Sequence, residues 1–312
     1  MDLCDEKKFV DLRKKLNFNE NKGIITSFSD SSGNNWVVKR KISSGTTGTV
    51  VSYRCNNSKY ADVVIKYFTG GDQYAKLDAA HEIEIIDSLN KLNCKDFIKI
   101  GIKKHNNKDL VIMEEIDGDL GRLNFKIFKN QLKAFSIIVN FVVLGSLCAY
   151  RANKVFVDIK SENIGFKVCK NGRVKFTFID FGSFYDINDK NPMTTFFINR
   201  ESFQKGEFSN KVLFIYGTCI TFLNLRLAVQ SKDQMYDFIA YNLDYLSLEK
   251  KYRSRKGLLS LENYNKLKEK FYSFGKFNEP LIDTVFRELK KITVSVQSPG
   301  VFLQNLQKNN IY

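Results

Sequence analysis

Four polar residues in the middle of the chain could together handle a phosphate and a metal ion. Asp158, Lys160 and Asn163 lie in the stretch VFVDIKSENIGF, between apolar residues expected to be buried, and Asp180 follows the run VKFTFI. Mg²⁺ favours carboxylates together with substrate phosphates, and a lysine beside them can offset phosphate charge. The simpler interpretation of the stretch is a polar turn between two strands.

The elements around these residues favour the metal and phosphate interpretation. IGFKV and VKFTFI are apolar and β-prone, and they flank CKNGR, whose Asn-Gly pair is the strongest two-residue hairpin signal. With this pair as the turn, Asn163 would lie opposite Asp180 in the ladder, next to Asp158 and Lys160. The sequence therefore predicts an oxygen-rich cluster beside a lysine at the open end of a hairpin.

Strand-like patterns dominate residues 35–116, and long helical segments follow them, interrupted only around residues 154–185. Hairpins are expected in NNWVVKRKISSGTTGTVVSYRC and FIKIGIKKHNNKDLVIMEEI, a further strand in DVVIKYF, and a helix in LDAAHEIEIIDSLNKL. The apolar side of this helix is predicted to carry Ala80, Ile83, Ile86 and Leu89. The expected organisation is an N-terminal extension over 1–34, a β-rich lobe over 35–116, and a helical lobe with a divergent C-terminal region over 117–312.

The composition is that of an ordinary globular protein, with 43% hydrophobic and 27% charged residues among 312. A net charge of +15 permits attraction to nucleic acid or to an acidic partner without identifying either. The apolar stretches 134–150 and 212–225 fall short of the roughly 20 apolar residues that a span requires, and each carries polar residues. No membrane span is therefore expected.

The amino terminus predicts an intracellular location, because it is charged from its second residue and does not resemble a secretory signal. Six cysteines without C-x-x-C spacing also favour an intracellular protein over one built on a disulfide or zinc framework. The expected compartment is the cytoplasm or nucleus, which for a viral protein means the host cell or the virion.

Short motifs, in order and each on the element that it requires, give residues 36–225 a resemblance to the protein-kinase family, serine/threonine type. SSGTTGTV resembles the glycine-rich loop, VVIK the lysine-bearing strand, HEIEII the helix whose glutamate pairs with that lysine, and VIMEEI the segment that borders the adenine. FVDIKSEN and IDFG resemble the catalytic loop and the metal-binding motif. The nucleotide-binding residues that this resemblance implies are Ser43, Gly45, Gly48, Val50, Val64, Lys66, Glu82, Met113, Glu114 and Ile116.

The resemblance implies a two-lobed α+β fold, with a small β-rich N-lobe and a larger α-helical C-lobe. It also implies ATP and Mg²⁺ as cofactors, and transfer of the γ-phosphate to hydroxyl groups of protein substrates whose identity the sequence does not give. Lys66, fixed by Glu82, would orient the α- and β-phosphates. The implied roles in transfer are a catalytic base for Asp158, contact with the γ-phosphate for Lys160, and metal ligation for Asn163 and Asp180.

Several positions depart from the family pattern. Phe156 and Val157 replace its His and Arg, Gly165 replaces a large apolar residue beneath the adenine, and no A-P-E motif follows Asp180. The abundance of Lys, Asn, Ile and Phe with loose motifs resembles the divergence met in kinases of large DNA viruses.

Two alternative functions stay open. The motifs missing after Asp180 belong to the parts of the family fold that support docking of a protein substrate. Their absence leaves room for a kinase-like phosphotransferase acting on a small molecule. A pseudokinase that serves as a binding or scaffold module is the other alternative. A scaffold, however, has no chemical reason to keep the lysine, the base, the asparagine and the metal-binding aspartate together.

Overall fold

Two compact units divide the chain in the computed structural model. The first unit comprises Met1–Asp119 and Gly165–Gly182, and the second comprises Leu120–Ile164 and Ser183–Tyr312. The structure describes residues 7–22, 24–44, 48–68, 73–92, 100–106, 108–169, 173–188, 209–248, 259–295 and 297–310.

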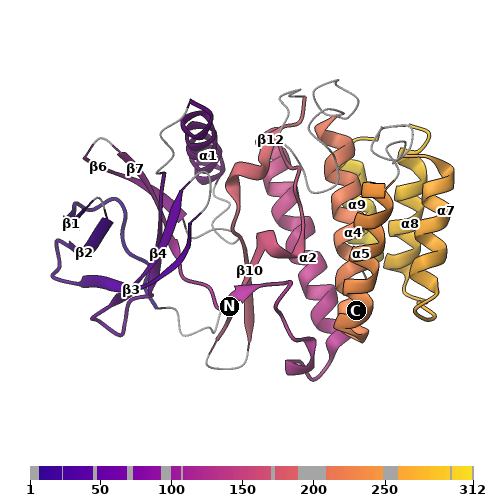
Figure 1. The fold of residues 1–312 in the computed structure, drawn as a ribbon, viewed down its shortest axis with the longest axis horizontal. Coiled ribbons are helices and arrows are strands. Elements are labelled where there is room, and N and C mark those ends of the chain that lie inside the picture. Colours follow the sequence, from indigo (N-terminus) through magenta and orange to yellow (C-terminus); the bar gives the residue numbers. More distant parts are fainter. Residues whose placement is uncertain are drawn as a thin grey trace. The chain divides into compact units, whose positions relative to one another are not determined.

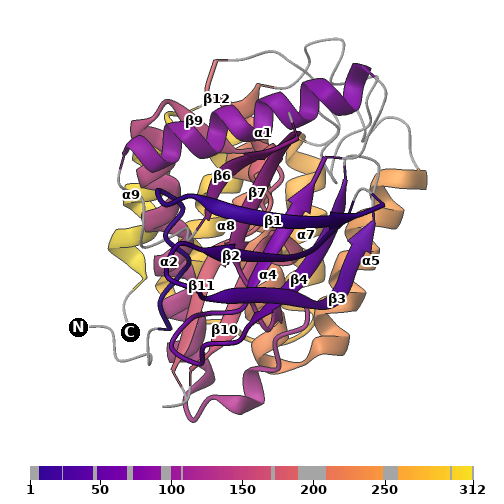
Figure 2. The same ribbon diagram turned by 90° about the vertical axis from the view of Figure 1, so that its left-hand side faces the viewer.

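A seven-stranded antiparallel sheet forms the framework of the first unit (Figures 1 and 2). Its strands follow the order β1-β2-β3-β4-β5-β7-β6, so most neighbours along the chain are also neighbours in the sheet. The two hairpins and the further strand predicted for this region are confirmed, and two additional strands precede them. The strands are β1 (Leu16–Asn21), β2 (Ile24–Asp30), β3 (Asn35–Ser44), β4 (Thr49–Cys55), β5 (Val63–Tyr67), β6 (Ile100–His105) and β7 (Lys108–Glu114).

Aromatic side chains fill the core against which this sheet packs. The rings of Phe28 and Trp36 stack with centroids 5.0 Å apart, and Tyr53 meets Phe28 edge-on at 5.7 Å. All three side chains are fully buried. Large aromatic rings contribute more buried apolar area than any other side chains, so these contacts hold β2, β3 and β4 together.

Side chains of the two edge strands meet, which makes the sheet nearly closed and barrel-like. The Nε2 atom of His105 on β6 lies 2.9 Å from a carboxylate oxygen of Glu20 on β1, and the ring of Phe18 lies 5.0 Å from the His105 ring. Asn106 donates to the same oxygen of Glu20 at 2.9 Å. The edges of the sheet are thus joined through side chains rather than left open.

This arrangement corrects the expected fold class. The two-lobed kinase-like fold, with a small β-rich N-lobe and a larger helical C-lobe, is wrong, because the structure has a nearly closed seven-stranded sheet accompanied by several helices. The difference arises from residues 16–30, which form β1 and β2 and extend the sheet until its edges meet. The broader assignment to a mixed α+β protein is the part that holds.

Helix α1 (Gln73–Lys91) confirms the predicted helix, and two of the residues expected on its apolar side, Ile86 and Leu89, are fully buried. The other two are not, since Ala80 is exposed and Ile83 is half-buried. The buried residues are Glu82, Ile85, Ile86 and Leu89. A carboxylate on the buried side of a helix requires a charged or hydrogen-bonding partner, and this requirement leads to the candidate site.

The predicted hairpin is confirmed by a three-stranded sheet with the order β11-β10-β8. Its strands are β8 (Gly118–Asp119), β10 (Ile164–Val168) and β11 (Val174–Phe178). Near the turn, the Cys169 amide donates to the Arg173 carbonyl at 2.7 Å, while Asn171 and Gly172 lie outside the described residues. The expected opposition of Asn163 and Asp180 stays a prediction.

The second unit is mainly helical (Figure 1). Its central helix is buried along nearly its whole length and has contacts with the other long helices of the unit. Short strands and 3-10 turns complete the part of this unit that the structure describes. The elements are η1 (Phe125–Ile127), α2 (Gln131–Arg151), β9 (Lys154–Phe156), η2 (Ser161–Asn163), β12 (Phe184–Asp186), α4 (Asn210–Gln230), α5 (Lys232–Leu248), α7 (Leu261–Tyr272), α8 (Pro280–Ile292) and α9 (Pro299–Asn309).

Two helices in the described part of the chain, α2 and α4, are long and apolar enough to cross a membrane by length and composition. Each has 21 residues, so both are longer than the apolar stretches seen in the sequence. The most apolar window of α4 is 94% buried inside the protein, and that of α2 is 56% buried. Core helices pass the same test, so these lengths are weak support for a membrane span.

Candidate functional site

A buried ion pair joins the lysine-bearing strand to helix α1. The Nζ atom of Lys66 on β5 lies 2.5 Å from Oε2 of Glu82, and the two side chains are 17% and 5% exposed. Strand β5 is otherwise buried and apolar, so Lys66 has a low-dielectric environment on most sides. The other carboxylate oxygen of Glu82 is buried and makes no hydrogen bond within the described residues.

The electrostatic environment disfavours a charged Glu82. Burial raises the pKa of the Glu82 carboxyl above its usual value, Lys66 opposes this effect, and the negative charge of Asp180 adds to it. Gly182 lies between the carboxylates of Asp180 and Glu82. A Cβ atom on Gly182 would lie 3.5 Å from Asp180 Oδ1 and 3.7 Å from Glu82 Oε2. The first unit therefore brings together Lys66, Glu82 and Asp180, one cation and two carboxylates.

The residues expected in a glycine-rich loop connect β3 to β4. Ser43 is exposed on β3 and pairs with Val50 on β4, while Gly45 lies outside the described residues. Gly48 passes so close to β5 that a Cβ atom would lie 2.1 Å from the Tyr67 carbonyl oxygen. The glycine at this position is therefore explained by the close approach of two backbones, whatever else the loop contacts.

Val50 and Val64 give the lysine-bearing region an apolar surface. Val50 pairs with Lys66 between β4 and β5, and Val64 pairs with Met113 between β5 and β7. Val64 is buried, whereas Val50 and Met113 are half-buried.

Gly165 permits a close apolar contact in the same unit. A Cβ atom on Gly165 would lie 2.5 Å from Cδ1 of Ile116 and 2.8 Å from Cγ2 of Ile179. The volume of the large side chain expected at this position is thus occupied by isoleucine side chains from two other segments.

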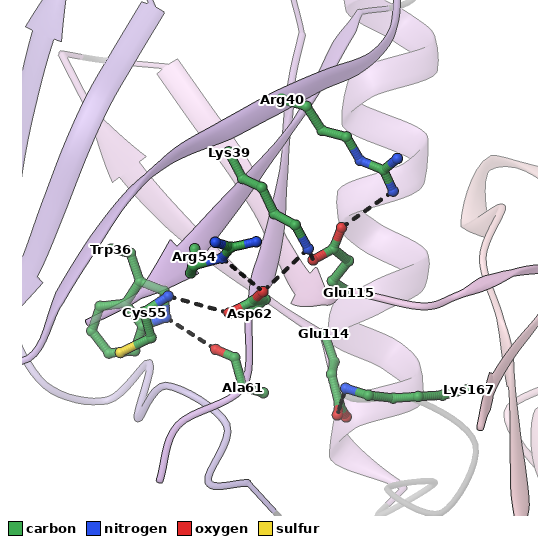
Figure 3. A network of polar contacts seen from close by, with 10 residues as sticks. All are labelled: Trp36, Lys39, Arg40, Arg54, Cys55, Ala61, Asp62, Glu114, Glu115 and Lys167. Carbon is green, nitrogen blue, oxygen red and sulfur yellow. Dashed lines mark hydrogen bonds and ion pairs between the residues drawn. The ribbon is translucent and has the colours of Figure 1, made fainter. Parts of the chain in front are cut away.

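The segment Glu114–Ile116 is held by ion pairs on both carboxylates (Figure 3). Glu114 pairs with Lys167 at 2.6 Å, and Glu115 pairs with Lys39 at 2.7 Å. The Glu115 amide donates to the Asp62 carbonyl at 3.0 Å. Within the described residues, no hydrogen bond uses the N–H of Ile116.

The second unit brings together the other three candidate residues. Lys160 Nζ lies 2.6 Å from Oδ2 of Asp158, and the Asn163 amide nitrogen donates to the Asp158 carbonyl at 2.8 Å. The same nitrogen lies 3.4 Å from Asp158 Oδ2. The Asp158 side chain is 14% exposed, which leaves it accessible but largely shielded.

Packing explains the apolar residues that precede Asp158. Phe156 is fully buried and stacks on Phe184 with centroids 4.4 Å apart, and Val157 donates its amide to the Ser183 carbonyl at 2.9 Å. The hydroxyl of Thr221 on α4 donates to the Ile159 carbonyl at 2.8 Å. The loop that carries Asp158 is therefore fixed on one side by β12 and on the other by α4.

The two predicted metal ligands fit Mg²⁺ in their chemistry. Because the Asn163 amide nitrogen donates to Asp158, its oxygen Oδ1 is the atom that remains for a cation. Asp180 supplies a carboxylate beside Glu82. No cluster of three or more His, Cys, Asp or Glu residues occurs in the part of the chain that the structure describes, but Mg²⁺ bound mainly through substrate phosphates needs only one or two carboxylates.

Three residues of this region escaped the sequence analysis, namely Lys39, Asp62 and Glu115. Lys39 bridges Glu115 and Asp62, at 2.7 Å and 3.2 Å. The available signal was the pair of adjacent glutamates after the apolar run LVIM, because one of two successive side chains on a strand must face inward and needs a cation there. The sequence cannot indicate which lysine supplies it.

Comparison with known proteins gives no further guide, because no protein-family model and no curated protein matches the chain.

Proposed function

We propose that the chain is an ATP-dependent phosphotransferase of the serine/threonine protein-kinase type. The proposal depends on the site residues and not on the fold, since the nearly closed sheet departs from the kinase arrangement. The observation that carries it is the buried Lys66–Glu82 ion pair beside Asp180.

Stability alone does not account for this ion pair. Taking two charges out of water costs more than their attraction usually returns, and apolar residues of similar volume often serve stability equally well. Burial, with a smaller contribution from the neighbouring Asp180 carboxylate, raises the pKa of Glu82, so the charged form is held at a cost. A lysine fixed by one carboxylate next to a second is the arrangement that a nucleotide's phosphates and their Mg²⁺ require.

The apolar residues and backbone groups of the first unit support a nucleotide as the ligand. Val64, Ile116 and Ile179 offer apolar contacts for a planar base, and the Ile116 N–H offers a hydrogen-bond donor to its edge. Sites for small molecules typically combine an apolar lining with a few fixed polar groups.

In the proposed reaction, Lys66 holds the α- and β-phosphates. Asp158 accepts the proton of the attacking hydroxyl, the bond between the γ-phosphorus and the β,γ-bridging oxygen breaks, and the new bond forms to the acceptor oxygen, leaving ADP. Lys160 offsets negative charge on the transferred group. Mg²⁺ held mainly through the nucleotide's phosphates, with the Asp180 carboxylate as a ligand from the same unit as Lys66, would neutralise charge on the phosphate oxygens.

The test is transfer of labelled γ-phosphate from Mg·ATP to a panel of basic and acidic proteins. We expect label on protein hydroxyls, reduced in Asp158→Asn by a factor of about 10² to 10⁴, the typical worth of a positioned base. Glu162→Gln is the matched control, because Glu162 lies in the same loop but is exposed and accepts a hydrogen bond from Ser161. Its transfer rate should equal that of the wild type.

Absence of label on any protein would call for a binding measurement with ATP. ATP binding without transfer would favour a small-molecule acceptor or a scaffold function. Absence of ATP binding would overturn the proposal, as would equal activity of Asp158→Asn and the wild type.

A further inference from the structure

Two consecutive carboxylates of the first unit are paired with lysines from different strands (Figure 3). Glu115 pairs with Lys39 of β3, and Glu114 pairs with Lys167 of β10. Successive side chains of an extended segment point to opposite sides, so the two ion pairs hold the segment from both faces.

The Lys39 pair is the more enclosed of the two. The Glu115 side chain is only 9% exposed, and Lys39 also reaches Asp62 at 3.2 Å. The hydrogen bond to Glu115 raises the pKa of Lys39, so the lysine stays charged. Arg40 adds a longer contact to Glu115 at 3.5 Å. The carboxylate of Glu115 is thus held by two cations that are consecutive on one strand.

The Lys167 pair has backbone support on the other face. The Asp117 amide donates to the Phe166 carbonyl at 2.9 Å, and the Val168 amide donates to Asp117 Oδ2 at 2.7 Å. Both bonds use Asp117 and attach it to Phe166 and Val168, on either side of Lys167 in β10. The ion pair between Lys167 and Glu114, at 2.6 Å, adds a further contact between this segment and β10.

Between the two attachments lies a single unused donor. The amides of Glu115 and Asp117 donate to Asp62 and Phe166, whereas the N–H of Ile116 has no acceptor in the described part of the chain. A donor that is fixed before the ligand arrives costs less conformational entropy on binding than one on a mobile loop. A fixed N–H is also selective, since it can donate only to a ligand whose acceptor atom lies at the matching position.

We propose that the Lys39–Glu115 and Lys167–Glu114 ion pairs position the Ile116 N–H for the base of the bound nucleotide. Lys39 and Lys167 are positioning residues that act through the segment Glu114–Ile116 and do not touch the nucleotide themselves. This inference rests on the proposed function, because it assigns the base of ATP to this segment.

The test compares the ATP dissociation constant of four full-length variants, one of them Lys39→Met, by calorimetry, without an acceptor and below the unfolding temperature of each. Lys167→Met should weaken ATP binding about tenfold, since it frees one face of the segment. The charge exchange Glu114→Lys with Lys167→Glu restores the ion pair and should return the constant to within about twofold of the wild type. Lys104→Met is the control, because Lys104 is 80% exposed and pairs only loosely with Asp109 at 3.9 Å on the same sheet.

Steady-state kinetics distinguish a positioning role of the two lysines from a general loss of folded protein. A positioning role raises the KM for ATP in Lys167→Met and in Lys39→Met while kcat stays unchanged. Unchanged ATP affinity in both variants would overturn the inference, even if they unfold more easily, because the pairs would then serve stability alone. Failure of the charge exchange to restore binding would also overturn it, since Lys167 would then act by direct contact. If the wild type itself does not bind ATP, the proposed function fails first.

Discussion

Lys66 and Glu82 lie 2.5 Å apart and join β5 to α1 in a region where the Glu82 side chain is 5% exposed. Removing one partner of such a pair leaves a buried charge without compensation, which typically costs about 3–5 kcal/mol. We therefore expect Lys66→Met to lower the free energy of unfolding by about this amount. Lys66→Met combined with Glu82→Leu should lose clearly less, since no charge is left behind.

Urea unfolding of the two variants and the wild type measures this difference. Equal losses in the single and double variants would mean that the two side chains are not coupled. Both variants should fail to transfer phosphate, because neither keeps the lysine.

The raised pKa of Glu82 makes a prediction about pH. A carboxyl whose pKa is raised on folding binds its proton more tightly in the folded protein, so its contribution to stability is complete below the unfolded pKa, about 4.5, and declines as the pH rises through the folded pKa. Glu82→Gln does not titrate and lacks this decline. The stability of the wild type relative to Glu82→Gln should therefore fall as the pH rises above 4.5.

Thermal unfolding of both proteins between pH 4 and pH 8 tests the sign. A difference that grows in favour of the wild type with rising pH would show that Lys66 outweighs burial at this carboxyl.

Gly165→Ala should weaken ATP binding through Ile116. The added methyl would lie 2.5 Å from Ile116 Cδ1 and 2.8 Å from Ile179 Cγ2, so both isoleucines must move. Overpacking of this kind typically costs about 1–3 kcal/mol. Ile116→Val removes the Cδ1 atom, so the double variant should recover part of the lost stability and of the lost ATP affinity.

Ile116→Val alone is the control and should change either quantity only slightly, since it deletes one methyl group. If Gly165→Ala loses stability but keeps the ATP affinity of the wild type, the contact is structural and the base binds elsewhere.

Local structure could largely be predicted from the sequence, whereas the closure of the sheet could not, and the roles of the site residues stay predictions. The hairpins, the strand with Lys66 and the helix with Glu82 follow from patterns of two and about 3.6 residues and from turn residues, all of which are local. The pairing of Lys66 with Glu82 was expected from the resemblance alone, and the structure brings the two together.

Residues 16–30, part of the expected N-terminal extension 1–34, show where prediction of the sheet from the sequence stops. LNFNEN and IITSFSD are short and carry many polar residues, because β1 is mostly exposed or half-buried. Their place in the sheet depends on contacts with residues far along the chain, such as Glu20 with His105. Such contacts leave no local signal. The same reason explains why Lys39 and Lys167 could not be recognised as the partners of two adjacent glutamates.

Phe28 tests whether residues 16–30 belong to the core of the first unit or form a dispensable extension. Its ring is fully buried between Trp36 and Tyr53, so Phe28→Ala should lower the free energy of unfolding by about 3–5 kcal/mol. Ile24→Ala is the matched control on the same strand, because Ile24 is 47% exposed, and it should change stability by no more than about 0.5 kcal/mol. An extension outside the core would tolerate both substitutions alike, so equal and small effects in chemical denaturation would contradict the closed sheet.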